Sequence, residues 1–259
     1  MKKKLFFVLG LLMAVVVQGQ TYWNGTSNKV FSGSGTQSDP YLIGTPEQLA
    51  GLAERTNVDK EDFAGQYIKL TADIYLTNFN DLDTANWKEW IPIARTNSQQ
   101  LSGGGSTTDY SYFSGHFDGD GHTIYNLYYN GGAGWGDDWD PDDPLFDPAA
   151  FIGALDLNAW NNALFTNVKG GTIENLNMAN GHMCGIQGTS FLANNTTDGA
   201  VIRNCHVQGY FRGTGDMNPA GLVAYNYGLI ENSSANVTTQ GSGGASLVYT
   251  NEQGGVIRN

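Results

Sequence analysis

The triplet Ile173-Glu174-Asn175 recurs through the second half of the chain at almost constant spacing. The other copies are Ile202-Arg203-Asn204, Ile230-Glu231-Asn232 and Ile257-Arg258-Asn259, and the isoleucines follow one another after 29, 28 and 27 residues. A unit of about 28 residues is too short to bury its own apolar face, whereas stacked units bury a continuous core. The repeat therefore predicts a solenoid.

The repeat unit predicts that this solenoid is all-β, a parallel β-helix with about three short strands in each coil. The pieces of the unit are rich in β-branched residues, and no unit shows the long 3.6-residue apolar period of a helical repeat. Equivalent residues of neighbouring coils would then lie about 4.8 Å apart, which is the spacing of paired strands. Each repeated position becomes a column of stacked side chains.

We expect two ladders of identical side chains in this stack. The isoleucines point into the core. The asparagines stand at a turn, where they adopt the left-handed conformation and bond from coil to coil through their amides. A related triplet, Ile124-Tyr125-Asn126, lies 49 residues before Ile173 and is placed in the same columns. The predicted ladders are Ile124, Ile173, Ile202, Ile230 and Ile257, and Asn126, Asn175, Asn204, Asn232 and Asn259.

The middle position of the triplet alternates in charge, reading Glu174, Arg203, Glu231 and Arg258. If these side chains point outward on stacked strands, each meets an opposite charge above and below, which helps to set the register. The next position places Cys205 in the apolar column of Leu127 and Leu176. Cys184 matches no column, so two separate buried thiols are favoured, although exported cysteines could also pair.

The composition argues against several classes of function. The 259 residues include 25 acidic and 13 basic side chains, 35 glycines and 2 cysteines, and the formal net charge is −12. An excess of acid disfavours nucleic acid as a partner. Two cysteines are too few for a disulfide scaffold. Charged residues make up 15% of the chain, which is too little for a coiled coil or a charge-driven disordered segment.

Residues 1–19 have the pattern of a secretory signal peptide. Lys2, Lys3 and Lys4 precede an apolar run of 13 residues, Leu5–Val17, and a small residue, Gly19, stands before a cleavage point at Gln20. Thirteen residues are too few to span a bilayer, and no other long apolar run follows. We therefore expect a secreted or cell-surface protein of bacterial type with no membrane span in the mature chain.

Behind the signal peptide, residues 20–110 are expected to form an N-terminal cap and the first coils. Thr45-Pro46-Glu47-Gln48 has the capping-box pattern that opens a helix. Strands are expected at Tyr67–Leu70, Asp73–Leu76 and Trp90–Ile93. A solenoid end exposes its core and its strand edges, so we expect a short capping helix to cover this end.

Residues 111–259 are expected to form the β-helix proper, with an insert loop at about residues 131–160. The insert follows from the 49-residue spacing between Ile124 and Ile173, since one coil takes about 28 residues. The chain stops at Asn259 in mid-repeat, and this predicts a truncated C-terminus with further coils beyond it.

Several stretches resemble the secreted bacterial GLUG-motif proteins. They are residues 31–36, 39–43, 47–50, 67–74 and 113–124, and the segment Gly221-Leu222-Val223-Ala224-Tyr225-Asn226, which is similar to the GLUG repeat itself. The resemblance covers about residues 22–130 and 160–259. It implies a right-handed β-helix exported to the cell surface or the medium. Its members include adhesin-like proteins and non-catalytic parts of secreted peptidases, so it implies no activity.

Asp118, Asp120 and His122 form the cluster that most resembles a catalytic or metal site, because carboxylates beside a histidine can move protons or bind a metal. The same Asp-Gly-Asp-Gly sequence is also an ordinary turn leading into a coil. This structural interpretation is the favoured one. The chain has no His-Glu-x-x-His, no Gly-x-Ser-x-Gly and no phosphate-binding loop.

The insert loop is the most distinctive surface segment that the sequence predicts. Six aspartates fall within residues 137–147, and three tryptophans lie in or beside the insert. Trp135, Trp139 and Trp160 could stack on sugar rings, and Asp138, Asp140 and Asp142 have alternate spacing that could hold Ca²⁺, although the glycine and distal glutamate of an EF-hand are missing. The alternative is a solvated acidic loop with the tryptophans folded back onto the coil.

Three interpretations of function remain open at this stage. The first is an adhesin-like binding module with no cofactor other than this possible Ca²⁺, whose partners would be host or dietary glycans or surface proteins. The second is a β-helical polysaccharide lyase or glycoside hydrolase, which would place acids and bases on one outer face of adjacent coils. The repeat columns hold Asn, Glu/Arg and Ile instead, and this favours binding. A third possibility is the non-catalytic N-terminal part of a larger secreted peptidase.

Overall fold

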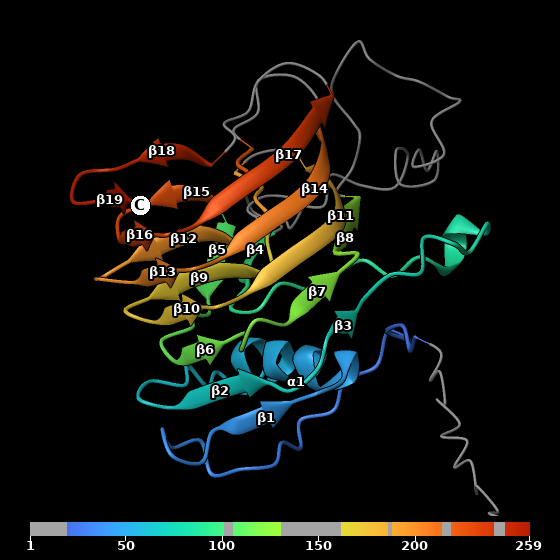
Figure 1. The fold of residues 1–259 in the computed structure, drawn as a ribbon, viewed down its shortest axis with the longest axis horizontal. Coiled ribbons are helices and arrows are strands. Elements are labelled where there is room, and N and C mark those ends of the chain that lie inside the picture. The colour runs from blue at the N-terminus through green and yellow to red at the C-terminus, as the bar shows by residue number, and fades with distance from the viewer. Residues whose placement is uncertain (1–19, 101–105, 131–161, 186–187, 214–218, 241–246) are drawn as a thin grey trace, which may run out of the picture.

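The structure is a computed structural model that describes residues 20–100, 106–130, 162–185, 188–213, 219–240 and 247–259. These residues form a β-solenoid of about six turns (Figure 1). Each regular coil contributes one strand to each of three parallel sheets. The stack runs from β1 (Tyr41–Ile43) at one end to β19 (Val256–Arg258) at the other. The predicted parallel β-helix is confirmed.

The first sheet carries the triplet repeat and contains seven strands in the order β1-β2-β6-β10-β13-β16-β19. Every neighbouring pair in it is parallel. Each strand is short because a corner follows it directly, where the chain turns toward the next sheet. Between the two terminal strands lie β2 (Tyr67–Leu70), β6 (His116–Asp118), β10 (Thr172–Glu174), β13 (Val201–Arg203) and β16 (Leu229–Glu231).

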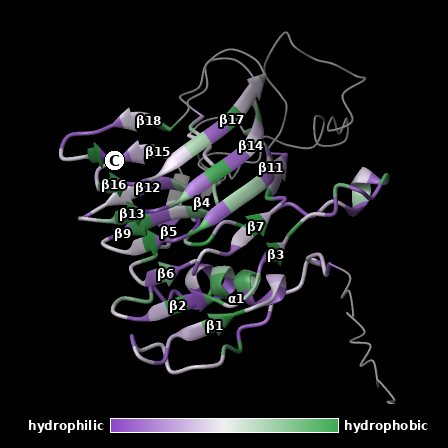
Figure 2. Cartoon of the chain, in the orientation of Figure 1, coloured by the Kyte–Doolittle hydropathy of each residue, from purple (hydrophilic) through white to green (hydrophobic). Residues whose placement is uncertain are grey.

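The second and third sheets complete the coils. The second has the order β17-β14-β11-β7-β3, with β8 paired to β11, and the third has the order β18-β15-β12-β9. Figure 2 shows hydrophobic and hydrophilic bands following one another along β11, β14 and β17. The strands of the second sheet are β3 (Ile74–Tyr75), β7 (Thr123–Tyr125), β8 (Tyr128–Asn130), β11 (Asn177–Gly185), β14 (His206–Gly213) and β17 (Ser234–Gln240). Those of the third are β9 (Phe165–Lys169), β12 (Ala193–Thr197), β15 (Val223–Asn226) and β18 (Val248–Asn251).

A helix occupies the first coil, where a third-sheet strand would otherwise lie. Helix α1 (Pro46–Asn57) begins as its sequence predicts, since the Thr45 side chain accepts a hydrogen bond from the Gln48 backbone at 3.2 Å. Gln48 Oε1 accepts in return from the Gly44 backbone at 2.9 Å, one residue earlier than in a standard capping box. Leu49 and Leu52 are fully buried, so the helix closes one side of the core.

The segment between β3 and β6 adds a hairpin to the outside of the solenoid. Strands β4 (Thr96–Gln100) and β5 (Ser106–Tyr110) pair antiparallel, and a short 3-10 helix, η1 (Thr84–Asn86), precedes them. Residues 90–93, which the sequence predicts as a strand, form no named strand. Ile93 instead makes a single parallel bridge to Phe165 of β9. The base of the hairpin thus continues the third sheet by isolated bridges.

The isoleucine column matches the repeat in four coils and differs in the one before them. The register joins Ile173 to Ile202, Ile202 to Ile230 and Ile230 to Ile257. Below Ile173 the column holds Phe117, not Ile124. The placement of Ile124 in this ladder was wrong, because Ile124 lies on the second sheet, where it pairs with Ile74 and Met178.

The asparagine column requires the same correction. Asn175, Asn204 and Asn232 all have left-handed φ angles, of 53°, 52° and 48°, at the corner after the first sheet. Asn126 has φ 60° as well, but it accepts from Asn180 at 2.8 Å within the second sheet. Both places favour asparagine for its tolerance of positive φ. The same residue signature therefore marks two different bends of the chain.

The position after the triplet is apolar or small and faces the interior. Leu176 and Cys205 are fully buried there, while Leu127 belongs to the second-sheet bend and not to this column. Burial raises the pKa of the Cys205 thiol to about 12, which keeps it protonated and unreactive. No disulfide joins Cys184 to Cys205. Two separate buried thiols are the arrangement that the sequence favours.

The predicted signal peptide, residues 1–19, and the whole predicted insert loop, residues 131–160, lie outside the described residues. Of the residues that the structure does describe, none belongs to a helix with the length and apolar character needed to cross a membrane.

Candidate functional site

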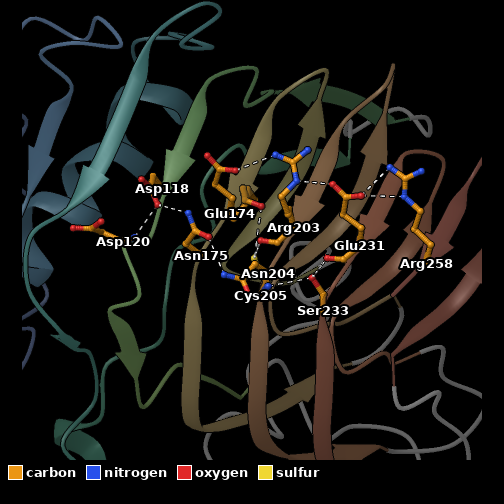
Figure 3. A network of polar contacts seen from close by, with 11 residues as sticks. Asp118, Asp120, Glu174, Asn175, Arg203, Asn204, Cys205, Glu231, Ser233 and Arg258 are labelled. Carbon is orange, nitrogen blue, oxygen red and sulfur yellow. Dashed lines mark hydrogen bonds and ion pairs between the residues drawn. The ribbon is translucent and has the colours of Figure 1, made fainter.

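The alternating charges of the first sheet form one outward column across four coils (Figure 3). Arg203 lies between two acids, with its Nη1 3.3 Å from Glu174 Oε2 and its Nε 2.5 Å from Glu231 Oε1. Arg258 Nη2 approaches the other Glu231 oxygen at 2.8 Å. Each charge thus meets opposite charges on its neighbouring strands, which supports this register.

Glu231 is the acid of the column that pairs with two arginines, Arg203 and Arg258. Hydrogen bonds from Arg203 and then Arg258 lower the pKa of its carboxyl group, and the hydrogen bond to Glu231 raises the pKa of Arg203. Only 13% of the Glu231 side chain is exposed, compared with 44% for Arg203. The two guanidinium groups therefore hold this carboxylate in its ionised form.

The alternation ends below Glu174, where the register places a second acid, Asp118. Asp118 is directed to other partners, because its Oδ1 accepts from Asn175 Nδ2 at 3.0 Å and from the Asp120 backbone at 2.8 Å (Figure 3). Lys69 stands one strand further down and bonds Asp120 at 2.9 Å. The neighbouring carboxylates of Asp118 and Glu174 therefore have different partners. Asp118 accepts from an amide and from the backbone, whereas Glu174 pairs with Arg203.

The cluster of Asp118, Asp120 and His122 does not converge on one point. Asp118 bonds Asn175, Asp120 pairs with Lys69, and His122 Nδ1 lies 3.4 Å from Asp73 Oδ1. Among the described residues, no group of three or more His, Cys, Asp or Glu side chains could hold a metal ion. The geometry matches the turn interpretation of this segment.

The predicted ligand residues of the insert lie outside the described residues. These are Trp135, Trp139 and Trp160, together with the possible Ca²⁺ ligands Asp138, Asp140 and Asp142. Their role stays a prediction.

A groove of about 400 Å³ lies beside the hairpin, on the third sheet. Its floor comes from neighbouring strands, with Asn167 and Lys169 on β9 and Asn195 and Thr197 on β12. The volume falls within the usual range of small-ligand sites, which is about 300–1,000 Å³. Its other lining residues are Tyr110, Tyr112, Asp198 and Tyr227, and we call the whole feature the tyrosine groove.

The tyrosines of this groove present large rings to solvent. Tyr110, Tyr112 and Tyr227 are 54%, 37% and 43% exposed. The first two stack with their ring centres 6.2 Å apart and an interplanar angle of 13°. Lys169 Nζ lies 5.0 Å from the centre of the Tyr112 ring and 3.6 Å from Asp198 Oδ2. The groove therefore combines apolar ring faces with a polar floor whose two charges face each other.

Asn167 connects the hairpin to the floor of the groove. Its Nδ2 donates to the backbone oxygens of Ala94 and Ser111, at 3.0 and 3.1 Å, and these residues flank the hairpin on both sides. Its Oδ1 accepts from Asn195 Nδ2 at 3.3 Å. Lys60 adds a 2.5 Å ion pair to Asp109 of β5. The wall that carries Tyr110 and Tyr112 is thus held against the solenoid by side chains of other elements.

Sequence reasoning missed this groove. Its residues come from segments far apart in the chain, and the hairpin that brings Tyr110 and Tyr112 to the third sheet has no counterpart in the repeat. The available signal was the run Tyr110-Ser111-Tyr112 followed by Phe113. Its alternation indicates two aromatic rings on one face of an extended segment.

Comparison with known proteins gives one distant similarity. The chain is 28% identical over 206 residues to a halomucin of Haloquadratum walsbyi. The match covers 78% of this chain and 2% of the halomucin, so the chain spans a very small part of that protein's length. No family model matches the chain, and no solved structure matches it.

Proposed function

We propose that this protein is a secreted or cell-surface β-solenoid that binds extracellular ligands. The observation that carries the proposal is the tyrosine groove, a wide and open groove of about 400 Å³ with exposed aromatic rings over a polar floor. Concave sites of this composition are typical of ligand-binding surfaces. The regular coils below it provide a rigid support, because each strand of the floor is paired on both sides.

The charged groups of the groove favour binding over catalysis. Lys169 and Asp198 face each other at 3.6 Å, and the Lys169 ammonium lies over the Tyr112 ring. An acid–base enzyme of the lyase or hydrolase type would need groups directed at a substrate bond. The acids and bases of the first sheet are paired with one another in the same way.

Export supports the proposal from the sequence. Residues 1–19 have the composition of a signal peptide, and the similarity to a halomucin is compatible with a surface protein. The resemblance to GLUG-motif proteins points in the same direction. We further propose that the insert loop contacts glycans through Trp135, Trp139 and Trp160, aided by Ca²⁺ at Asp138, Asp140 and Asp142.

The test combines location with binding. Cells that produce the full chain are fractionated, and a separate sample of intact cells is treated with proteinase K. The purified protein is incubated with a glycan array with and without Ca²⁺. We expect protein in the medium or in the protease-accessible fraction, together with ligand binding. Retention in the cytoplasm, or cleavage of a polymer during the assay, would contradict the proposal. Trp139→Ala reports on the insert loop separately.

A further inference from the structure

We infer that the tyrosine groove binds a neutral glycan chain that lies across the coils, parallel to the solenoid axis. This inference rests on the proposed binding function and adds the site, the ligand class and the direction of the ligand. Its residues are Tyr110, Tyr112, Asn167, Lys169, Asn195, Thr197, Asp198 and Tyr227.

The direction follows from the order of the lining residues along the stack. Tyr112 precedes Phe113, which bridges Val168 of β9, so Tyr112 lies one level below Lys169. Thr197 pairs with Lys169 one level above. Tyr227 follows β15 and stands one further level up, since β15 pairs with β12. Three steps of strand spacing extend over roughly 14 Å. Tyrosine rings therefore stand at both ends of a polar floor.

The chemistry of this surface suits sugar rings. A pyranose ring has apolar C–H faces and a rim of hydroxyl groups, so it can stack on tyrosine while its hydroxyls bond to amides and hydroxyls. The Thr197 hydroxyl and the Asn195 side-chain oxygen provide such groups between the rings of Tyr112 and Tyr227, while the Asn195 Nδ2 donates to Asn167 and Asn194. Aromatic rings at separated points fit a ligand that repeats the same ring along its length.

An extended peptide fits this groove less well. Peptides that add to a sheet use the free backbone groups of an edge strand. Strand β12, which forms the centre of the floor, is paired on one side with β9 and on the other with β15. The floor therefore offers side chains and no strand edge.

The charge of the groove selects a neutral chain. Its two ionised side chains, Lys169 and Asp198, oppose each other at 3.6 Å, so the groove carries no excess of either sign. The whole chain has 25 acidic and 13 basic residues, and this excess repels polyanions at a distance. An acidic glycan would gain no unpaired cation here and would approach a negative protein.

The experiment measures binding of the full chain to defined probes by affinity gel electrophoresis and titration calorimetry. The probes are soluble neutral glucans, mannans and galactans, with polygalacturonate as the acidic glycan and a set of extended peptides as the alternative class. We expect binding to at least one neutral polymer that changes little between low salt and 0.5 M NaCl. Preference for polygalacturonate or for peptides would overturn the inference.

Substitutions then locate the contact. Tyr112→Ala and Tyr227→Ala are expected to weaken binding about tenfold each, which corresponds to one stacked ring. Tyr112→Phe keeps the ring and is expected to bind nearly as the wild type does. Tyr249→Ala is the matched control, because Tyr249 is also 41% exposed but does not line the groove. Circular dichroism melting curves are recorded for each variant to check that it is folded.

The outcomes separate this inference from the proposed function. Neutral-glycan binding that survives both alanine substitutions but fails in Trp139→Ala overturns the groove and retains a surface binding module. Binding only to intact cells or only to non-glycan polymers would likewise overturn the groove and retain a surface binding module. A protein that stays in the cytoplasm and binds no probe contradicts both.

Discussion

Asparagine at the corners of the first sheet has a conformational role that few residues can replace. Asn175 and Asn204 hold left-handed φ angles of 53° and 52°, and Asn204 Nδ2 donates to Asn175 Oδ1 at 2.9 Å. Most other side chains with a Cβ are strained in this region, by about 1–2 kcal/mol. The corner therefore depends first on backbone tolerance and second on the amide bond between coils.

Substitution of Asn204 separates these two effects. Asn204→Gly loses the amide but accepts φ 52°, whereas Asn204→Ala loses the amide and adds strain. We expect the alanine variant to lose roughly 1 kcal/mol more of the free energy of unfolding than the glycine variant. Urea denaturation followed by circular dichroism measures both. Equal losses would mean that the amide bond, and not the conformation, dominates.

The isoleucine column provides a second test with its own internal control. Ile202 is fully buried, while Ile257 occupies the same column with 40% of its surface exposed. Removal of a buried isoleucine side chain costs about 2–5 kcal/mol, because lost burial and a cavity add together. We expect Ile202→Ala to fall in this range and Ile257→Ala to lose about 1 kcal/mol or less. Similar losses at both sites would contradict the described burial.

At the scale of the strands, the alternating column shows how a sequence repeat becomes a register. The parallel pairing of β10, β13 and β16 brings Glu174, Arg203 and Glu231 side by side. A slip of one residue in any of these strands would turn its charged side chain inward and its isoleucine outward. The charged column and the buried column therefore support the same alignment from opposite faces of the sheet.

The column makes stability depend on pH in a defined direction. The pKa of Glu231 is lowered below its usual value of 4.5 by Arg203 and Arg258, so its stabilisation is present above that value. It is lost as the pH falls through the lower pKa of the folded state. We expect the difference in Tm between wild type and Glu231→Gln to be largest near neutral pH and to shrink as the pH falls below 4.5.

The control for this pH dependence is an acid outside the column. Glu252 lies in the turn between β18 and β19, and its carboxyl group is not part of the charged column. Glu252→Gln removes one carboxylate outside the column and is measured in parallel as the matched substitution. A Glu231→Gln difference that stays constant down to pH 3 would show that the carboxylate contributes no pH-dependent stability.

Sequence reasoning identified the elements whose pattern repeats or whose capping is local. The four triplets from Ile173 onward and helix α1 follow from residues near in sequence. Ile124-Tyr125-Asn126 was misplaced because an apolar residue and a left-handed asparagine serve equally well at a bend of the second sheet. The true equivalent of the triplet is Phe117-Asp118-Gly119. It also has an apolar residue followed by a charged one, but glycine stands in place of asparagine.

On the scale of the whole molecule, the core is one continuous stack from α1 to the last coils. Buried side chains of all three sheets meet along the axis, so each coil is stabilised by the coils above and below it. The tyrosine groove depends on this stack and on one hairpin added to it. It could not be predicted from the repeat, since its rings come from Tyr110, Tyr112 and Tyr227, which share no repeated position.

The thiol of Cys205 reports on opening of this stack. It is fully buried in a central coil, and burial raises its pKa to about 12, so a reagent such as iodoacetamide meets almost no thiolate in the folded protein. We expect peptide-resolved mass spectrometry at pH 8 to find Cys205 unmodified until urea unfolds the coils around it. Rapid labelling in the absence of urea would contradict the described burial. Labelling that tracks the circular dichroism transition would show that the central coils unfold together.

The alternation of charge has a consequence for how such a chain can change in length by duplication. With Glu174, Arg203, Glu231 and Arg258 in successive coils, the true period of the array is two coils. Insertion or loss of a single coil would bring like charges together on adjacent strands. Insertion or loss of a pair would preserve the alternation of charge in this column. Gene duplication within this repeat should therefore be tolerated best in steps of two coils, or roughly 56 residues.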